Sequence, residues 1–248
     1  MNAKPQKKRL DLLVVERGLA ASRQKAQAMI LAGEVSVDGL KAEKAGAQIA
    51  ESARLDVTSR LQKYASRGGL KLEGALADFA VSPSGFICLD LGSSTGGFSD
   101  CLLQHGAARV YAVDVNTDQL AWRLHQDPRV IQIKRNAREL RPEEIPEPID
   151  LVVADVSFIS VTKIMPPAVL AAKPGATFLV LIKPQFELRR EDIGEGGIVK
   201  DPSLHKKAIA SVENAAQSNG LEILGVSPSR ITGFEGNQEF FLHARKIV

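Results

Sequence analysis

Few of the residues that would build a disulfide framework, a zinc site or a membrane span occur in this sequence. It has two cysteines and four histidines among 248 residues, and their spacing matches no zinc-binding pattern. Its apolar runs fall short of the about 20 residues that a membrane-spanning helix needs, and its charged N-terminus differs from a secretory signal. We therefore expect a cytoplasmic protein with no metal and no membrane contact, in which Cys88 and Cys101 are reduced and buried.

Charge is nearly balanced over the whole chain but unevenly distributed along it. The formal net charge is +3. Residues 1–64 hold 12 Lys and Arg against 7 Asp and Glu, a net +5, whereas residues 65–248 hold 20 against 22, a net −2. A basic small domain beside a near-neutral large one is typical of a polyanion-binding module attached to an enzyme. A solvated lysine-rich surface would give the same distribution, so charge alone does not identify the partner.

A glycine-rich stretch at residues 90–100, Asp-Leu-Gly-Ser-Ser-Thr-Gly-Gly-Phe-Ser-Asp, is the most informative part of the sequence. An apolar run at residues 86–89 precedes it and apolar residues at helical spacing follow it, so the pattern predicts a strand, a tight turn and a helix. Glycines in such a turn let backbone N–H groups approach a ligand at the helix N-terminus. A second predicted strand, residues 110–113, ends at Asp114, whose carboxylate can accept hydrogen bonds from ribose hydroxyls. Together these features predict a site for a nucleoside cofactor.

Two residues of the turn indicate which cofactor this is. The nicotinamide fingerprint needs a second glycine where this chain has Ser94. The acidic Asp90 would repel a diphosphate but suits a cationic sulfonium group. We therefore predict S-adenosylmethionine. The alternative is an ordinary tight turn of an α/β protein.

Alternating strands and helices continue through residues 67–248 and predict an α/β domain. The further strands expected are residues 130–133, 149–155, 177–184, 221–226 and 239–243, and the expected helices are residues 70–79, 120–124 and 204–216. Open α/β sheets place their chemistry at the carboxyl ends of the strands, where Asp155 and Lys183 stand. A charge at the end of an apolar strand needs a partner. Asp155 and Lys183 therefore either pair with each other or act together on one substrate hydroxyl.

Residues 9–58 predict a separate small α+β module, between a disordered basic arm at residues 1–8 and a joint at residues 59–66. Helices are expected at residues 10–18 and 22–33, the second capped by Ser22. A strand at residues 35–37, an Asp-Gly turn and a strand at residues 55–57 follow. In the joint, we expect Tyr64 to pack between the domains rather than to stack on a base.

The small module resembles the alpha-L RNA-binding module of ribosomal proteins and pseudouridine synthases. The resemblance lies in Arg-Leu-Asp at residues 9–11, Gly-Leu at 18–19, Ser-Arg-Gln-Lys-Ala at 22–26 and Ile-Leu-Ala-Gly-Glu-Val-Ser-Val-Asp-Gly at 30–39. It implies that the first two helices bind structured RNA through phosphates and shape. The RNA-binding residues that we expect are Arg9, Arg17, Ser22, Arg23 and Lys25, with Arg67 at the start of the large domain. A helical docking domain without RNA affinity is the alternative.

The large domain resembles the FtsJ (RrmJ) class of RNA ribose methyltransferases, whose cofactor loop reads Asp-Leu-Gly-x-x-x-Gly-Gly-aromatic-Ser, as residues 90–99 do here. The class carries a Lys-Asp-Lys-Glu tetrad, which maps onto Lys71, Asp155, Lys183 and Glu239. The resemblance implies a class I Rossmann-like domain with a mostly parallel seven-stranded sheet. It also implies that Lys183 is the base or hydroxyl-polarising group, which the other three tune and orient. The residues implied for the cofactor site are Asp90, Gly92, Ser94, Thr95, Gly96, Gly97, Asp114, Asn136, Ala137 and Asp155.

An alpha-L module ahead of an FtsJ-like domain resembles the TlyA group over essentially the full chain. These proteins are similar to ribosomal RNA cytidine 2′-O-methyltransferases, and some are named hemolysins. The resemblance implies S-adenosylmethionine as the cofactor and ribosomal RNA as the partner. The chain ends soon after residues 240–242, which resembles the short form linked to 23S rRNA alone, whereas longer members are linked to both ribosomal subunits.

Two other functions compete with methyl transfer at this stage. One is a ribosome-associated factor that keeps the fold without catalysis, which the intact tetrad and cofactor turn oppose. The other is a membrane-active hemolysin, which neither a spanning run nor a basic amphipathic helix of useful length supports. The glycine-rich residues 194–197 are expected to form either a lid over RNA or a plain surface loop.

Overall fold

The computed structural model describes residues 7–20, 22–31, 33–57, 63–233 and 236–248. Contacts divide the chain into two compact units, Met1–Lys63 and Tyr64–Val248. The boundary falls inside the expected joint at residues 59–66, of which residues 59–62 lie outside the described part. Each unit has a hydrophobic core of its own.

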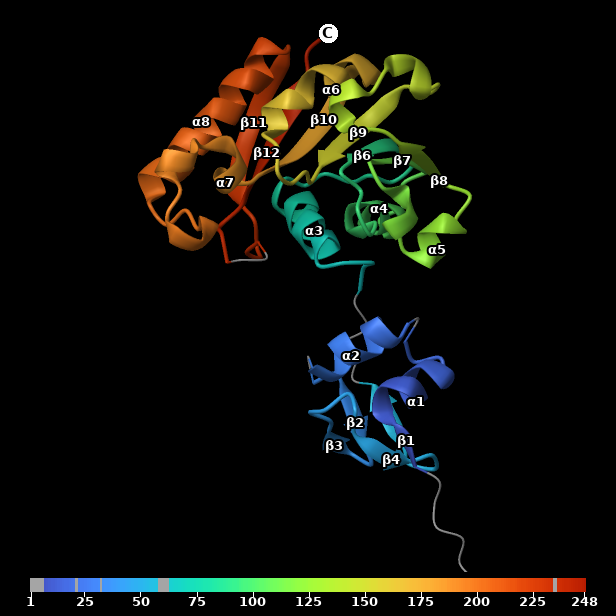
Figure 1. The fold of residues 1–248 in the computed structure, drawn as a ribbon. Helices are drawn as coiled ribbons and strands as arrows, with labels where there is room; N and C mark the ends of the chain where they lie inside the picture. The colour runs from blue at the N-terminus through green and yellow to red at the C-terminus, as the bar shows by residue number, and fades with distance from the viewer. Residues whose placement is uncertain (1–6, 21, 32, 58–62, 234–235) are drawn as a thin grey trace, which may run out of the picture. The chain divides into compact units, whose positions relative to one another are not determined.

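The small unit is an α+β module, as predicted. Its helices are α1 (Leu10–Glu16) and α2 (Arg23–Leu31), and its three-stranded sheet has the order β3 (Leu40–Lys41), β2 (Val35–Val37), β5 (Leu55–Val57) (Figure 1). Leu10, Val14, Ile30 and Val35 are buried together and join the helices to the sheet. The expected Asp38-Gly39 turn connects β2 to β3 with positive φ at both residues, 51° and 83°, as a two-residue hairpin of this type requires.

The basic arm is shorter than predicted, because Lys7 and Lys8 belong to a strand. This strand, β1 (Lys7–Arg9), pairs antiparallel with β4 (Gln48–Ala50), with Lys7 opposite Ala50. A three-residue strand of basic residues has no apolar alternation, so the pattern could not predict it. Residues 1–6 of the expected arm lie outside the described part.

The large unit is built on a seven-stranded sheet with the order β11-β12-β10-β9-β6-β7-β8. The strands are β6 (Ile87–Leu91), β7 (Arg109–Asp114), β8 (Val130–Lys134), β9 (Ile149–Ala154), β10 (Ala172–Ile182), β11 (Leu221–Pro228) and β12 (Phe240–Lys246). Strands β10, β9, β6, β7 and β8 run parallel, and β12 runs antiparallel to its neighbours β10 and β11. The prediction of a mostly parallel sheet in an α/β domain is confirmed.

Helices cover both faces of this sheet. They are α3 (Gly68–Asp78), α4 (Gly97–Gln104), α5 (Trp122–His125), α6 (Met165–Ala171), α7 (Pro184–Glu187) and α8 (Pro202–Ser218). Figure 1 shows α3 and α4 on one side of the sheet and α6 and α8 on the other. The helix expected at residues 120–124 is shorter than predicted, since Leu120 and Ala121 have extended backbone after a 3-10 turn at Thr117–Gln119.

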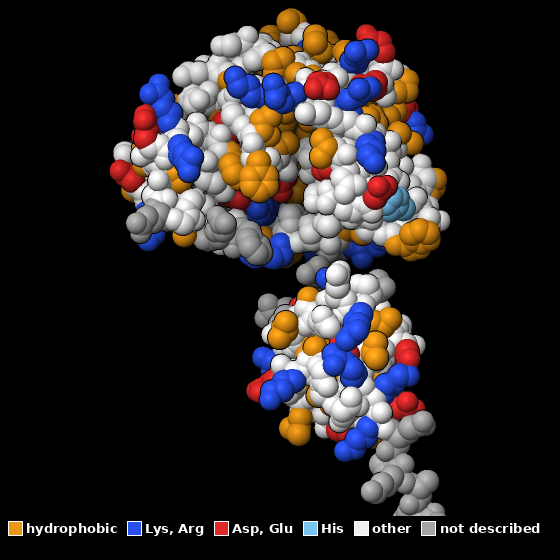
Figure 2. Space-filling view, in the orientation of Figure 1, with side chains coloured by type: hydrophobic (Ala, Val, Ile, Leu, Met, Phe, Trp, Pro, Cys, Tyr) orange, Lys and Arg blue, Asp and Glu red, His pale blue; other side chains and the backbone are white. Residues whose placement is uncertain are grey.

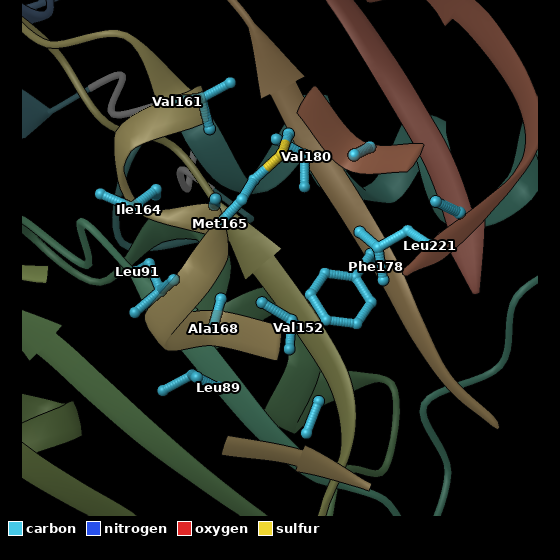
Figure 3. Packing of buried hydrophobic residues seen from close by; sticks show 14 of the residues in the cluster. Leu89, Leu91, Val152, Val161, Ile164, Met165, Ala168, Phe178, Val180 and Leu221 are labelled. Atoms are coloured by element: carbon cyan, nitrogen blue, oxygen red, sulfur yellow. The ribbon is translucent and has the colours of Figure 1, made fainter. Parts of the chain in front are cut away.

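Alternate residues of the central strands belong to two hydrophobic cores, one on each face of the large sheet. Leu89 and Val152 pack with residues of α6 and α8 in the first core, part of which Figure 3 shows. Their chain neighbours Cys88 and Val153 point the other way and pack with residues of α3 and α4. Because successive strand residues face opposite sides, a sheet covered on both faces needs continuous apolar runs. These are the runs from which the strands were predicted.

Tyr64 is buried inside the large unit, so the prediction that it packs between the domains is wrong. Its side chain is 1% exposed and belongs to the core under α3 and α4. A Cβ added at Gly69 would lie 2.3 Å from the Tyr64 side chain, so this glycine makes room for the ring. Burial raises the pKa of the phenol. The enclosed ring cannot stack on a base.

In the described part of the chain, no helix is both long and apolar enough to cross a membrane. Among the same residues, no cluster of three or more His, Cys, Asp or Glu side chains could hold a metal ion. Cys88 and Cys101 are free and buried, as predicted.

Candidate active site

Four strand ends bring predicted site residues to one edge of the large sheet. Strand β6 leads into the glycine turn, β7 ends at Asp114, β9 is followed by Asp155, and β10 is followed by Lys183. Because these strands are parallel neighbours in the order β10-β9-β6-β7, their carboxyl ends lie side by side. Three adjoining hollows open at this edge, and Ser157 lines all of them.

The first, which we name the cofactor hollow, has a volume of about 450 Å³. Six of the residues predicted for the cofactor site line it, namely Gly92, Ser94, Asp114, Asn136, Ala137 and Asp155. Apolar side chains, among them Val115 and Ile164, form other parts of its wall. A concave site of this size with a few polar groups among apolar ones is typical of a binding site for a small molecule.

The glycine turn is shaped by close contact with its neighbours. Gly92 has φ 85°, and a Cβ there would lie 2.6 Å from the carbonyl oxygen of Asp155, so a side chain would push the ends of β6 and β9 apart. Asp114, at the end of β7, stabilises the turn, because its Oδ2 accepts a hydrogen bond from the backbone N–H of Ser94 at 2.9 Å. The turn, Asp114 and Asp155 are thus held as one unit.

Four of the predicted cofactor residues lie elsewhere. The Asp90 side chain is fully enclosed behind the turn, where its Oδ2 accepts a hydrogen bond from the Ser99 hydroxyl at 2.6 Å. Burial raises the pKa of Asp90 to about 7. Gly96 faces Leu124, and the Thr95 carbonyl accepts a hydrogen bond from Ala121. Asp90 therefore supports the turn from the core and does not line the cofactor hollow, where we expected it. Gly97 lines the second hollow, which is described next.

The second hollow, about 230 Å³, contains three of the tetrad residues and is named the tetrad hollow. Lys183 Nζ lies 2.6 Å from Asp155 Oδ1, and Lys71 Nζ lies 2.5 Å from Glu239 Oε2. Lys183 is 8% exposed and Glu239 is 2% exposed. Burial raises the pKa of Glu239, and the nearby Lys71 opposes that rise. The four predicted catalytic residues are thus brought together as two ion pairs.

The structure is compatible with both hypotheses for Asp155 and Lys183, namely that they pair with each other and that they act together on a substrate hydroxyl. They pair with each other, which compensates two charges at the ends of apolar strands. They also both line the tetrad hollow, where a substrate group can reach them. Pairing therefore does not remove them from the site.

The third hollow, about 350 Å³, is also lined by Lys183 and is named the aromatic hollow. Phe158 and Phe186 line it with ring centroids 5.4 Å apart, together with Lys71 and Glu239. The Phe158 side chain is 93% exposed, although it is apolar. Figure 2 shows hydrophobic side chains at the edge of a depression in the large unit, with basic and acidic side chains within it.

Several lining residues were not found from the sequence. Ser157 and Phe158 come two and three residues after Asp155, and their place after a strand-end acid was a usable signal. Ser66, which lines the tetrad hollow, stands five residues before Lys71. Thr232 also lines that hollow, and it carried no signal, since it comes from the loop before β12.

The glycine-rich residues 194–197 are attached at their C-terminal end. Asn237, which is buried, donates a hydrogen bond from Nδ2 to the Gly197 carbonyl at 2.9 Å. Its Oδ1 accepts a hydrogen bond from the Val199 N–H at 2.8 Å. Gly197 lines the aromatic hollow, so the segment borders the site with one end fixed.

The residues expected to bind RNA on the small unit also have structural contacts. Asp11, with no exposed surface, accepts hydrogen bonds from Arg9 and Arg23, which hold its pKa well below the usual range. Arg17 donates to the carbonyls of Ala53 and Glu51. The role of these arginines in RNA binding stays a prediction.

The remaining predicted RNA-binding residues fall into two places. The Ser22 hydroxyl accepts a hydrogen bond from the Lys25 N–H at 3.2 Å and so caps α2, as predicted, while the Lys25 side chain is exposed. Arg67 belongs to the large unit and lines the tetrad hollow.

Comparison with known proteins places this geometry in a family. A model of the FtsJ-like methyltransferases matches residues 64–246, and a model of the S4 domain matches residues 8–55. The chain is 46% identical over 239 residues to the 16S/23S rRNA (cytidine-2′-O)-methyltransferase TlyA of Mycobacterium tuberculosis, a match that covers 96% of this chain and 89% of that protein. It is 41% identical to Hemolysin A of Brachyspira hyodysenteriae over 95% of this chain and 98% of that one.

A solved structure of low sequence identity shares the fold of the large unit. The S-adenosylmethionine dependent methyltransferase of Mesorhizobium loti matches with a TM-score of 0.56 at 17% identity, over 73% of this chain and 100% of that one, and so supports the fold alone. The two ion pairs of the tetrad, the family match and the 46% identity to TlyA over 96% of this chain agree with one another. The chain therefore belongs to the TlyA group of FtsJ-like methyltransferases, with an S4 domain ahead of its methyltransferase domain.

Proposed function

We propose that this protein transfers a methyl group from S-adenosylmethionine to the ribose 2′-hydroxyl of a cytidine in ribosomal RNA, 23S rRNA in the first place. The observation that carries the proposal is the Asp155–Lys183 ion pair, which stands where the cofactor, tetrad and aromatic hollows meet. Cytidine and the 2′-oxygen come from the name of the Mycobacterium tuberculosis relative. That name includes 16S rRNA, which is the second candidate target.

The residues of the cofactor hollow fit S-adenosylmethionine. Asp114 stands at the end of β7, where a carboxylate can accept hydrogen bonds from ribose hydroxyls, and Val115 and Ile164 provide apolar walls for an adenine. Asp155 lines both the cofactor hollow and the tetrad hollow, so a carboxylate is available close to a cationic group. When bound, this cofactor supplies an electrophilic methyl group on a positively charged sulfur.

The tetrad residues prepare the ribose hydroxyl to attack. A ribose hydroxyl is a weak acid, so a positioned base must take its proton as the new bond to oxygen forms. For this step Lys183 first releases one proton from its amine to solvent; the neutral Nζ then takes the proton of the ribose hydroxyl, and Asp155, 2.6 Å away, stabilises the ammonium ion that forms again. Lys71 and Glu239 add a second charge pair beside it, and each of these charges is compensated by a partner.

The aromatic hollow suits the nucleoside of the substrate. RNA is read chiefly where bases are unstacked and laid against aromatic side chains. The exposed Phe158 ring beside Lys183 offers such a face within reach of the tetrad. An S4 domain ahead of the methyltransferase domain supplies the second contact with RNA, and a ribosomal substrate would place the protein in the cytoplasm.

A direct membrane-lytic activity is the competing function, because one relative is named Hemolysin A. The large polar site at the sheet edge has no use in such an activity. Purified protein that releases dye from vesicles of phosphatidylcholine and phosphatidylglycerol would favour the lytic function, and intact vesicles would leave methyl transfer as the proposal.

Methyl transfer is tested with labelled S-adenosylmethionine and separated ribosomal subunits that lack the modification. We expect label in RNA, and nuclease mapping should place it on a ribose 2′-oxygen of a cytidine in the large subunit. Label in both subunits would extend the target to 16S rRNA. Label on a base, or cofactor binding without transfer to either subunit, would overturn the proposal.

A further inference from the structure

Ser157 stands at the one place where all three hollows meet. Its side chain is exposed, and its hydroxyl accepts a hydrogen bond from Lys183 Nζ at 2.8 Å. It is not part of the Lys-Asp-Lys-Glu tetrad. A hydroxyl in contact with the lysine that takes the substrate's proton calls for an explanation of its own.

Two groups, the Asp155 carboxylate and the Ser157 hydroxyl, restrict the orientation of the Lys183 amine. Nζ lies 2.6 Å from Asp155 Oδ1 and 2.8 Å from Ser157 Oγ. A lysine that acts as a base is neutral, so its nitrogen carries two N–H bonds and one lone pair. Ser157 accepts one N–H group, and the Asp155 carboxylate pairs with the amine from a second direction, so the lone pair is restricted to the directions that remain. Without the hydroxyl, rotation about the last carbon–nitrogen bond would spread the lone pair over more than one direction.

The loop that carries Ser157 is fixed at its far end. Glu187 Oε1 accepts a hydrogen bond from the Val161 N–H at 2.8 Å, and its Oε2 accepts one from the Ser160 hydroxyl at 2.6 Å. Glu187 belongs to α7, which begins directly after Lys183. The loop after β9 and the helix after β10 are therefore tied together on both sides of the Ser157–Lys183 contact.

The backbone is strained at Phe158, the residue after Ser157, which indicates that the surrounding contacts hold this loop in place. Phe158 has φ 64°, in the left-handed region that non-glycine residues seldom adopt. Such a conformation costs about 1–2 kcal/mol and persists only where the surroundings enforce it. Here the contacts of Asp155 and Ser157 with Lys183 hold the chain before Phe158. The hydrogen bonds that Glu187 accepts from Ser160 and Val161 hold the chain after it.

We infer that Ser157 is a positioning residue, whose hydroxyl orients the amine of Lys183 so that its lone pair faces the ribose hydroxyl. This inference rests on the proposed function. In the step that it serves, the 2′-oxygen forms a bond to the methyl carbon, the carbon–sulfur bond breaks with its electron pair going to sulfur, and the proton of the hydroxyl moves to Lys183 Nζ. Ser157 keeps its own proton throughout.

The test compares Ser157→Ala and Ser157→Thr with the unaltered full-length protein, and uses Ser211→Ala on the exposed face of α8 as the matched control. For Ser157→Ala we expect kcat to fall about tenfold or more, as misorientation at a reacting centre does. The KM for RNA and the Kd for S-adenosylmethionine should stay within twofold. Ser157→Thr keeps a hydroxyl and should recover most of the rate, while Ser211→Ala should match the unaltered protein.

A second measurement needs no RNA and so separates this inference from the proposed function. Rotation of the Lys183 amine about its Cε–Nζ bond, measured by 15N relaxation of Nζ in protein with 15N-labelled lysine, should become faster in Ser157→Ala and stay slow in Ser157→Thr. If ribosomal RNA is not methylated at all, the proposed function fails while this measurement still decides the role of Ser157. An unchanged rate of rotation of the Lys183 amine in Ser157→Ala, or an unchanged kcat, would overturn the inference.

Discussion

Lys71 on α3 and Glu239, the residue before β12, form an ion pair whose side chains are 11% and 3% exposed. Removing one partner of such a pair leaves an uncompensated charge in a poorly solvated place, which typically costs about 3–5 kcal/mol. Replacing both partners by apolar residues costs much less. We therefore expect Lys71→Met to lower the free energy of unfolding by about 3 kcal/mol, and Lys71→Met/Glu239→Leu to be more stable than the single variant.

Urea unfolding of these variants checks the prediction. The surface pair Arg245–Glu222, with both side chains 52% exposed, provides the control, because exposed pairs contribute about 0–1 kcal/mol. Arg245→Met should therefore change the free energy of unfolding by less than about 1 kcal/mol. Equal losses in Lys71→Met and Arg245→Met would show that the buried pair has no special role in stability.

The buried carboxyl of Asp90 should make stability depend on pH. Burial raises its pKa to about 7 in the folded chain, against 3.8 for an ordinary aspartate. Between these values the folded state binds more protons than the unfolded state, so the free energy of unfolding should fall as pH rises from about 4 to 7. The slope of this contribution is at most about 1.4 kcal/mol per pH unit.

The variant Asp90→Asn isolates that contribution. It keeps an oxygen that can accept the hydrogen bond from the Ser99 hydroxyl but has no charge. We expect its free energy of unfolding, relative to the unaltered chain, to increase steadily when both are unfolded in urea at pH 4.5, 5.5, 6.5 and 7.5. A constant difference over this range would mean that Asp90 titrates as an exposed aspartate does.

Lys183→Ala should abolish methyl transfer while S-adenosylmethionine still binds. The variant removes the group that takes the proton of the ribose hydroxyl, a loss of the order of 10²–10⁴ in rate for a general base. Asp114, Asn136 and the glycine turn, which form most of the cofactor hollow, are unchanged. Single-turnover transfer of label and calorimetric binding of the cofactor measure the two effects separately. Full activity in Lys183→Ala would remove Lys183 from the proposed chemistry.

Lys25 and Arg23 should differ in what their substitution does, although both are predicted to bind RNA. Lys25 is exposed, so Lys25→Gln should weaken RNA binding, reduce the dependence of log K on log salt by about 1, and leave stability unchanged. Arg23 also pairs with the buried Asp11, so Arg23→Gln should in addition destabilise the small unit. Binding titrations at several salt concentrations and thermal unfolding test both parts, with Lys206→Gln on α8 as the control. If Lys25→Gln binds RNA as the unaltered chain does, the small unit has a different partner.

The sequence was sufficient for those parts of the fold that depend on apolar runs and turn residues. Strands β6, β7 and β9 are mostly apolar and lead into a glycine turn or an acid, so their ends and the residues Asp114 and Asp155 could be placed in advance. The tetrad followed from resemblance, and the structure brings its members together although Lys71 and Glu239 come from opposite ends of the domain. Sheet order explains this, since β12, the last strand in the chain, lies between β11 and β10 in the sheet.

The remaining features depend on contacts between segments that no local pattern connects. The hydrogen bonds between Asn237 and residues 197 and 199, and those that Glu187 accepts from Ser160 and Val161, join residues far apart in the chain. Asp90 was misplaced for a different reason, because a carboxylate next to a glycine turn can face either the ligand or the core. In the structure it faces the core, where its Oδ2 accepts a hydrogen bond from the hydroxyl of Ser99 in the following helix.

Phe158 should show a conflict between stability and activity. Its positive φ strains a residue with a side chain but not a glycine, so Phe158→Gly should be more stable to unfolding than Phe158→Ala by about 1 kcal/mol. Both variants lose the exposed ring that we propose as a face for the target base, so both should transfer methyl groups more slowly, and Phe158→Tyr should keep most of the rate. Urea unfolding and single-turnover kinetics, with cofactor binding as the control, measure the two effects on the same preparations. If Phe158→Ala transfers methyl groups as fast as the unaltered chain, the ring has no part in holding the base. If Phe158→Gly is no more stable than Phe158→Ala, the loop relaxes when the ring is removed, and the strain belongs to Phe158 itself rather than to the contacts around Ser157.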